Sequence, residues 1–441
     1  MRTAPALLAL PAAALLAAPP EFVTFNDDGA WCWFRDERAL IVRGRLVIGS
    51  VAAGVHDPAR RGDIEVVTYD LRTGRTARFE LHDRLQLDDH NAPALLALPG
   101  GHLLAVYAKH GPENRFYYRL STRPYDSTAW QDEQTFSPSP TSRITYSNLL
   151  YLSREKRVYN FYRGLENSFK PSYASSDDFG RTWRTGTVLI QVPGAFRHRP
   201  YVKYASDGAG ALHFFYTEGH PRDYDNSAYH MYYRAGRLYR SDGSLIGSLA
   251  DGLSRPEQGT RVFAGDADNV AWVSDIQLDR SGRPYVAYSV QKGGAGLPRE
   301  RHGEDHRYRY ARWAGARWED YEIAYAGSKL YPGEDDYTGN ITLDPADSDT
   351  VYISTNADPL TGRPLVSRAD GRRHWEIFRG RTADGGKSWR WSALTEDSAS
   401  DNIRPLVPRP EKGYGAVLWL RGTYSAYTNY DMDVVGLIFR R

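Results

Sequence analysis

The chain has 441 residues, of which 56 are lysine or arginine and 54 are aspartate or glutamate, so its formal net charge at pH 7 is +2. The charges are dispersed along the sequence, and this balance argues against a nucleic-acid-binding protein. Tyrosine (31), tryptophan (11), phenylalanine (15), glycine (40) and proline (25) are abundant. Because no segment of the body keeps a helical period, the composition indicates an all-β, turn-rich fold.

The first twenty residues differ from the rest of the chain. An almost uninterrupted apolar stretch runs from Ala4 to Ala18, which is too short to span a bilayer comfortably and is shaped like a secretory signal peptide. We therefore expect residues 1–20 to be a signal peptide, and residues 21–441 to form one secreted or periplasmic domain outside any membrane. The single cysteine, Cys32, excludes an intramolecular disulfide and a zinc site built from several cysteines.

Two β-rich runs joined by a Gly/Asp-type turn recur seven times along the chain. The starts of the second runs lie 54 to 72 residues apart, which suits a propeller blade with insertions and is too long for a leucine-rich or helical repeat. The repeat predicts an all-β, seven-bladed β-propeller with four-stranded antiparallel blades. The second runs are Arg45–Ala53, Gly101–Gly111, Lys156–Gly164, Gly210–His220, Gly282–Val290, Asp349–Ala357 and Tyr414–Gly422.

Two segments, Ser176–Trp183 and Thr382–Trp389, carry Ser or Thr, Asp, Gly, Ser or Thr, and Trp at the same offsets. They resemble the Asp-box that recurs in sialidases and other secreted propellers. We interpret each as a hairpin turn in which the Asp side chain accepts backbone hydrogen bonds, the Gly has a positive φ and the Trp packs between strands. These segments support the propeller and say nothing about the reaction.

The ends of the paired runs predict where a functional site lies. In an antiparallel pair the start of the first strand lies beside the end of the second, so these residues emerge on one face of the ring. The second to fourth repeats differ from the others because they carry His/His, Tyr/Arg and Arg/His pairs there. Their segments are Asp88–Pro93 with Tyr107–His110, Tyr146–Asn148 with Phe161–Gly164, and Arg197–Tyr201 with Thr217–His220; the other repeats place Trp31, Trp33, Arg35, Asp36, Trp272, Asp275, Asp335–Tyr337, Asn356, Asn402, Arg404 and Arg421 on this face.

Imidazoles, a phenol and a guanidinium fit β-elimination beside a uronate carboxylate better than glycoside hydrolysis, which usually needs two positioned carboxyl groups. Elimination needs a cation to hold the carboxylate, a base for the C5 proton and an acid for the leaving oxygen. Arginine suits the first task, and histidine and tyrosine suit the proton transfers. A tyrosine acting as the base would need a nearby cation to lower its pKa.

Five segments of the chain resemble the BNR-repeat family of secreted propellers, which includes seven-bladed ulvan lyases and rhamnosyl-glucuronate lyases. The resemblance covers about residues 25 to 438 and implies a lyase site with two histidines on one blade and a Tyr and an Arg on the next. The matching catalytic residues here are His90, His110, Tyr146 and Arg163, and His220 and Tyr201 follow as substrate contacts. The segments are Asp88–Leu96, Ala105–His110, Thr145–Leu149, Asn160–Gly164 and Gly219–Tyr233.

We add His198, Arg199 and Trp272 to the predicted substrate-binding residues because they belong to the same face. Each has a structural alternative. A histidine is often a satisfied rim residue, an arginine often holds blades together through carbonyl contacts, and a tryptophan often packs in the channel.

The sequence thus predicts a secreted polysaccharide lyase that cleaves an acidic, ulvan-like or rhamnosyl-glucuronate glycan. Arg163, helped by one histidine, would neutralise the carboxylate, and Tyr146 and the histidines would act as base and acid in an order that stays open. One alternative is a non-catalytic glycan-binding propeller with aromatic platforms. The other is a sialidase-like or other glycoside hydrolase, for which Arg35, Arg199, Arg404, Tyr424 and Glu218 are available.

We expect no required cofactor and no metal ion at the catalytic residues. The acidic turns Asp335–Asp336 and Asp266–Asp268 offer oxygen ligands to a structural Ca²⁺, although acidic turns without the full EF-hand spacing are usually solvated. We expect a monomer whose partner is the acidic polysaccharide.

Overall fold

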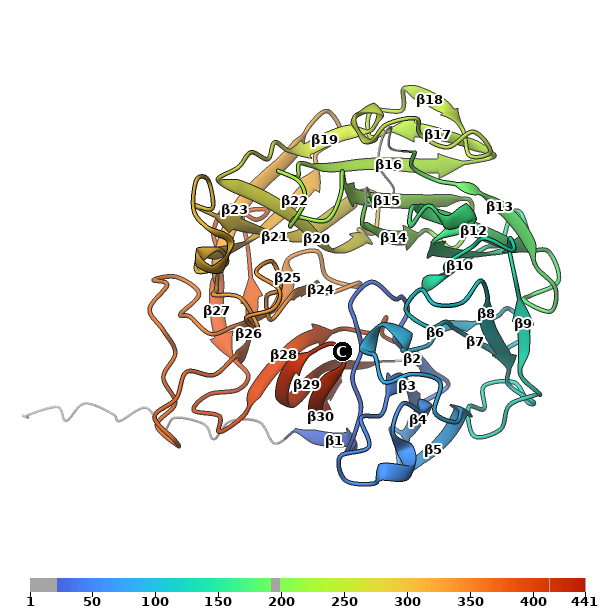
Figure 1. Ribbon diagram of the computed structural model, residues 1–441, viewed down its shortest axis with the longest axis horizontal. Helices are drawn as coiled ribbons and strands as arrows, with labels where there is room; N and C mark the ends of the chain where they lie inside the picture. Colours follow the sequence, from blue (N-terminus) through green and yellow to red (C-terminus); the bar gives the residue numbers. More distant parts are fainter. Residues whose placement is uncertain (1–21, 192–198, 412, 441) are drawn as a thin grey trace, which may run out of the picture.

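The computed structural model describes residues 22–191, 199–411 and 413–440. Within these ranges, thirty strands form seven antiparallel sheets, and the helices are short 3-10 turns. Figure 1 shows the sheets following one another in chain order around a central axis. The seven-bladed, all-β propeller that the repeat predicts is therefore confirmed. None of the helices in the described part of the chain has the length and apolar character to cross a membrane.

The first three blades each have four strands, as predicted. All seven second runs of the repeat form the second strand of their sheet. The strands of these blades are β2 (Ala39–Val42), β3 (Arg45–Val51), β4 (Ile64–Asp70) and β5 (Thr76–His82); β6 (Ala94–Ala97), β7 (Leu103–Tyr107), β8 (Phe116–Leu120) and β9 (Gln134–Phe136); β10 (Thr145–Leu152), β11 (Arg157–Arg163), β12 (Pro171–Ser176) and β13 (Arg184–Val188).

The fourth blade departs from the predicted four strands, because it has six. The hairpin β17–β18 extends the sheet beyond β16, and β19 pairs with the other end of β16. These extra strands account for the longest spacing between successive repeats. The strands of blades four to six are β14 (Val202–Ser206), β15 (Ala211–Thr217), β16 (Ala228–Arg234), β17 (Arg237–Arg240), β18 (Leu245–Ser248) and β19 (Thr260–Phe263); β20 (Asn269–Leu278), β21 (Pro284–Lys292), β22 (His306–Trp313) and β23 (Trp318–Gly327); β24 (Ile341–Leu343), β25 (Thr350–Thr355), β26 (Glu376–Arg381) and β27 (Arg390–Ala393).

The seventh blade closes the ring with strands from both ends of the chain. Its strands β28 (Asp401–Leu406), β29 (Tyr414–Ala426) and β30 (Asn429–Arg440) are completed by β1 (Val23–Asn26), which pairs with β30. Closure leaves the ring no free first or last blade. The 3-10 turns are η1 (Pro58–Arg60), η2 (Asp89–Asn91), η3 (Leu165–Asn167), η4 (Pro256–Gln258) and η5 (Arg299–Arg301).

Burial falls from the axis of the ring to its rim. Every residue of β7, β15 and β25 is buried, whereas most of β5 and β27 is exposed. Middle strands pack against neighbouring blades on both faces, which is why they read as continuous apolar runs rather than alternating ones.

The two Asp-box segments form the turns between the third and fourth strands of their blades, as predicted. Asp178 accepts the backbone N–H groups of Arg181 and Thr182 at 3.1 and 2.8 Å. Asp384 accepts the backbone N–H of Ser388 at 3.0 Å. Gly180 and Gly386 have φ values of 84° and 101°, and Trp183 and Trp389 are buried. Their role is structural.

The segment between β1 and β2 fills the centre of the ring, where Figure 1 shows it in blue. Trp31 and Arg35 are fully buried, and Trp33 and Phe34 nearly so. The segment contacts distant blades: the Trp33 indole donates to the carbonyl of Val273 at 3.3 Å. The sequence placed Trp31, Trp33, Arg35 and Asp36 on the predicted face of the first repeat, and the structure buries Trp31, Trp33 and Arg35 in the centre of the ring. In the sequence, the apolar residues between β1 and β2 resemble the start of a strand. Nothing in the neighbouring residues indicates that this segment packs across the ring.

Candidate active site

A buried ion pair lies beneath the predicted face of the ring. The Arg404 guanidinium contacts the Asp89 carboxylate, and both residues are fully buried. Arg404 also donates to the Trp31 carbonyl at 2.6 Å and to the Tyr424 hydroxyl at 2.7 Å. The Tyr424 hydroxyl in turn donates to Asp89 at 2.6 Å. This network, which we call the floor, joins the seventh blade, the central segment and η2.

The two predicted catalytic histidines share one carboxylate. His90 lies on η2, and the Asp88 side chain caps that turn by accepting the backbone N–H of His90 at 2.9 Å. The Nδ1 atom of His90 lies 2.7 Å from Asp88 Oδ1, and the Nδ1 atom of His110 lies 2.8 Å from Asp88 Oδ2. The two imidazole rings stack with centroids 4.1 Å apart and an interplanar angle of 12°. The His110 side chain is 23% exposed and that of His90 only 3%, so His110 is the more accessible of the pair.

Tyr146 and Arg163 come from paired strands of the next blade. Tyr146 lies where the register of β10 against β11 shifts, and its φ is +68°. A non-glycine residue in the left-handed region at a bulge is often found where a side chain must be aimed for function. The Arg163 guanidinium carbon lies 4.8 Å from the centre of the Tyr146 ring. Arg163 donates to the Tyr201 hydroxyl at 3.0 Å, and its Nη2 lies 3.4 Å from His110 Nε2.

The structure thus brings together all four residues that the resemblance implies to be catalytic: His90, His110, Tyr146 and Arg163. We call them the quartet. The Tyr146 ring centroid lies 5.6 Å from that of His90 and 6.4 Å from that of His110. Tyr146, Arg163 and Tyr201 also line one small cavity.

The surroundings give the quartet members different charges. Burial lowers the pKa of His110 to about 4, with help from the neighbouring His90 and Arg163 and against the pull of Asp88. Burial also opposes a charge on His90, but the acidic groups Cys32, Asp88 and Asp89 outweigh that effect and raise its pKa well above 6.5. Burial and the neighbouring Tyr201 raise the pKa of Tyr146 well above 10. At neutral pH, His90 is therefore an imidazolium, His110 is neutral and Tyr146 keeps its proton.

Three of the predicted substrate-binding residues form a chain of ring contacts that leads away from the quartet. Tyr201 contacts His220 with ring centroids 5.4 Å apart, and His220 contacts Trp272 at 5.0 Å. Trp272 is only 3% exposed and packs against Trp33, so its ring belongs to the centre of the ring rather than to an open platform. Arg199 is half-buried at the entry to β14. His198 lies outside the described residues.

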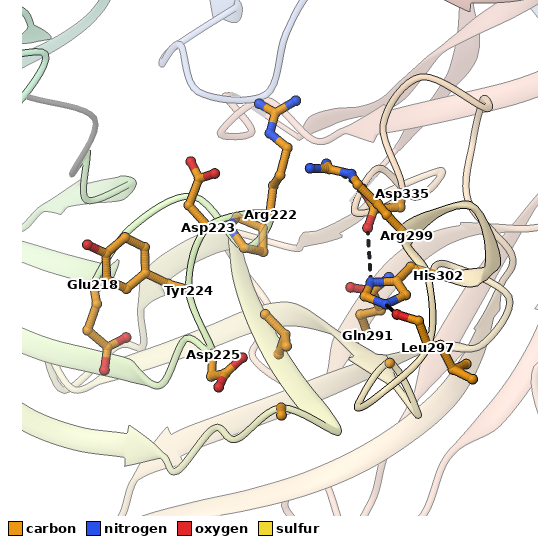
Figure 2. A pocket seen from close by; sticks show the side chains of 14 residues that line it. Glu218, Arg222, Asp223, Tyr224, Asp225, Gln291, Leu297, Arg299, His302 and Asp335 are labelled. Carbon is orange, nitrogen blue, oxygen red and sulfur yellow. Dashed lines mark hydrogen bonds and ion pairs between the residues drawn. The ribbon is translucent and has the colours of Figure 1, made fainter.

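A cavity of about 640 Å³ lies on the same face beyond His220, between the loops of blades four to six. Figure 2 shows the side chains that line this cavity, and a dashed line joins His302 to Asp335, whose atoms lie 3.5 Å apart. Arg222 donates to both oxygens of Glu334 at 2.9 Å, and Arg299 donates to Asp335 at 2.8 Å. The lining residues include Glu218, Arg222, Asp223, Asp225, Arg299, His302 and Asp335.

The acidic turns that the sequence offered to calcium bind protein groups. Asp335 is paired with Arg299, and Asp266 accepts the Asn269 side chain at 2.8 Å. His220, Glu334 and Asp336 also bring possible ligand atoms close together. However, the Arg222 guanidinium bonds Glu334 and lies 3.3 Å from His220 Nε2, so a cation already occupies that position. A structural Ca²⁺ stays a prediction.

Two residues of the site were missed from the sequence. Asp88 begins the segment Asp88–Leu96, but nothing in the sequence shows that its carboxylate reaches both histidines. Tyr427 lies in the turn between β29 and β30 and meets both histidine rings edge-on, at centroid distances of 5.0 and 5.6 Å. It comes from the seventh blade, and no motif marks it.

Comparison with known proteins agrees with this architecture. The model of a family described as "BNR repeat-containing family member" matches residues 53–326, more than half of the chain. No curated protein sequence matches the chain.

Solved structures give the same fold at low sequence identity. An ulvan lyase of polysaccharide lyase family PL25, bound to -[GlcA(1-4)Rha3S]-, superposes with a TM-score of 0.68 at 15% identity, covering 95% of this chain and 96% of that one. A second structure titled as a PL25 ulvan lyase gives 0.69 at 15% identity with the same coverage. The polysaccharide lyase Uly1 gives 0.60 at 10% identity, covering 96% and 100%.

Proposed function

The chain belongs to the BNR repeat-containing family, and we propose that it is a polysaccharide lyase that cleaves a uronate-containing glycan by β-elimination. The observation that carries the proposal is the convergence of the quartet from two neighbouring blades on one face of the ring. The likeness to an ulvan lyase bound to a glucuronate-containing glycan supports an ulvan-like or rhamnosyl-glucuronate substrate. The apolar stretch from Ala4 to Ala18 supports an exported enzyme.

Two cations of the quartet are suited to the substrate carboxylate. Arg163 presents a planar guanidinium that matches a carboxylate in shape and charge. His90 adds a second positive charge behind His110. Removal of the C5 proton puts negative charge on the carboxylate, and cations fixed in a partly buried site stabilise that charge without having to reorganise.

The other two members of the quartet are suited to the proton transfers. His110 is neutral, is the more exposed histidine, and presents the lone pair of Nε2 on the side of Arg163. We assign it the role of base for the C5 proton. Tyr146 keeps its proton over the physiological range and is assigned the role of acid for the leaving oxygen.

The proposed reaction balances without water. His110 Nε2 takes the C5 proton, and the electron pair of that C–H bond forms the C4=C5 double bond. The C4–O bond breaks, and the leaving oxygen takes the proton of the Tyr146 hydroxyl. The products are an unsaturated uronate and a sugar with a free hydroxyl group. Solvent then takes the proton from His110 and returns one to Tyr146.

The alternatives drawn from the sequence find less support. A sialidase-like site would need several arginines open to the substrate, whereas Arg35 and Arg404 are fully buried. Glycoside hydrolysis usually needs two available carboxyl groups, but Asp88 and Asp89 are buried and held by the histidines and by Arg404. A lectin would need exposed aromatic platforms, and Trp272 is buried.

A uronate panel tests the proposal. Incubation with ulvan, rhamnosyl-glucuronate glycans and other uronate polysaccharides should produce the ultraviolet absorbance of an unsaturated uronate with at least one of them. If this absorbance is absent with every uronate glycan tested, the lyase assignment is refuted.

Tyr146→Phe tests the assignment of the acid. It should lower kcat by about 100-fold to 10,000-fold, the usual contribution of a general acid, while KM changes little. Tyr151→Phe, on the same strand but outside the quartet, is the matched control and should leave kcat unchanged. Full activity of Tyr146→Phe would refute the role given to this hydroxyl.

A further inference from the structure

The geometry around Asp88 assigns the protons on both histidines. Asp88 is 2% exposed, and its two oxygens face the two Nδ1 atoms at hydrogen-bond distance. An ionised carboxylate is acceptor-only, so each Nδ1 must carry a proton and donate it. The charge of each imidazole is then decided at its Nε2 atom alone.

The two imidazoles have different surroundings. His110 Nε2 faces the Arg163 guanidinium, which can only donate hydrogen bonds, so this nitrogen must present its lone pair. His110 is therefore the neutral tautomer with its proton on Nδ1. His90 has a second carboxylate within reach, since Asp89 Oδ1 lies 2.9 Å from its Nδ1 atom.

The stacking of the rings rules out two imidazolium ions. With centroids 4.1 Å apart and one carboxylate between them, two imidazolium ions would repel each other in a buried place. At most one ring is therefore charged, and the second carboxylate beside His90 makes His90 the ring that carries the charge.

We propose that Asp88 is a positioning residue that holds the two stacked histidines in opposite protonation states, His90 as imidazolium and His110 as the neutral Nδ1–H tautomer. The consequence for catalysis rests on the proposed lyase function: one carboxylate prepares both the cation and the base of the site. The pKa of His90, raised well above 6.5, and that of His110, lowered to about 4, agree with this division.

The groups facing the histidine pair come from six parts of the fold. The central segment and η2 supply a thiol and a second carboxylate, and β10 and β11 supply a phenol and a guanidinium. The floor and the β29–β30 turn complete the shell. These groups are Cys32, Asp89, Tyr146, Arg163, Arg404 and Tyr427. Since Arg404 is paired with Asp89, Asp88 is the carboxylate that both rings share.

NMR of the protein labelled in its histidine side chains tests this proposal without any substrate. The signals of His90 and His110 are identified by their loss in His90→Gln and His110→Gln. In the wild-type protein at pH 7, one ring should show two protonated nitrogens and the other a proton on Nδ1 alone. Two neutral rings or two charged rings in the wild type would overturn the proposal, whatever the variants do.

Asp88→Asn tests the cause. Its side-chain oxygen can still cap η2, but the amide accepts from only one Nδ1–H and offers a donor to the other ring. The imidazolium of His90 should be lost at pH 7 and one ring should change tautomer, whereas unchanged histidine signals would overturn the proposal. Asp57→Asn is the matched control, because Asp57 caps η1 in the same way but is not a partner of His90 or His110, and it should leave both signals unchanged.

The two proposals fail separately. If the histidine signals change as expected but the wild-type protein cleaves no uronate glycan, the positioning role stands and the lyase function fails. If the protein is an active lyase, Asp88→Asn should move the acidic limb of its pH–rate profile, and Asp57→Asn should not.

Discussion

Replacing Arg404 by methionine should destabilise the protein strongly, because it breaks the floor network on one side. Methionine keeps much of the side-chain volume but removes the bonds to the Trp31 carbonyl, the Tyr424 hydroxyl and Asp89. Asp89 is fully buried and would keep only Tyr424 and His90 as partners. Removing one partner of a buried ion pair costs about 3–5 kcal/mol, since the other charge stays buried without compensation.

The measurement is the free energy of unfolding from urea titrations followed by tryptophan fluorescence. Arg84→Met is the matched control, because Arg84 pairs with Asp83 while its side chain is 67% exposed, and it should cost far less than Arg404→Met. The double variant Arg404→Met/Asp89→Asn removes both charges and should recover about 1–3 kcal/mol of the loss. A cost for Arg404→Met as small as that of the control would refute the account of the floor.

Three further predictions follow from the histidines and from one glycine. The base His110 has a pKa of about 4 and must be neutral, so kcat/KM should fall only as the pH drops toward 4; a limb near the ordinary histidine value of 6.5 would contradict that assignment. Burial lowers the pKa of His306 to about 4, so the unfolded chain binds the extra proton first, and stability is complete above pH 6.5 and is lost as the pH falls toward 4. His306→Leu should therefore flatten the acid side of the stability curve by about 3 kcal/mol, and an unchanged slope would argue against a neutral His306. Gly164 has a φ of +113°, and a Cβ atom there would lie 1.9 Å from the Arg143 carbonyl oxygen. Gly164→Ala should shift Arg163 and lower activity by about 100-fold, whereas Gly44→Ala, where the φ is +78° and the space is open, should not affect activity.

The architecture was predictable because it repeats. The second β-rich run of each of the seven repeats marks the second strand of a blade. Because neighbouring strands are antiparallel, the start of the first strand and the end of the second then lie on one face. That reasoning was enough to put the His/His and Tyr/Arg pairs on the same face before any contact was known. The repeat pattern alone therefore predicts that the four residues of the quartet lie near one another.

What could not be predicted depends on contacts between distant parts of the chain. The central segment crosses the ring and is held by Asp89, Asn148 and Val273, which belong to three other blades. The same limit applies within the site. Asp88 gains its role from the way η2 turns it toward His110, a residue 22 positions away. Tyr427 reaches the histidines only because the β29–β30 turn of the seventh blade extends to η2, at the entry to the second blade.

Arg404 shows how the same residue type takes opposite roles. From the sequence, Arg404 could bind a substrate carboxylate or hold blades together. Its contacts in the structure decide between these two roles. It is enclosed by Asp89, Tyr424 and the Trp31 carbonyl, whereas Arg163 bonds a tyrosine hydroxyl and faces a neutral histidine. The arginine without a carboxylate partner is the one suited to receive the carboxylate of a substrate.

The central claim is that the quartet breaks the glycosidic link by elimination rather than by hydrolysis. Cleavage of a glucuronate–rhamnose glycan in water enriched in heavy oxygen, followed by mass spectrometry of the products, tests it most directly. The account predicts products free of heavy oxygen, in which the new end carries an unsaturated uronate one water lighter than the saturated sugar. Saturated products that contain one heavy oxygen atom per cleavage would contradict it.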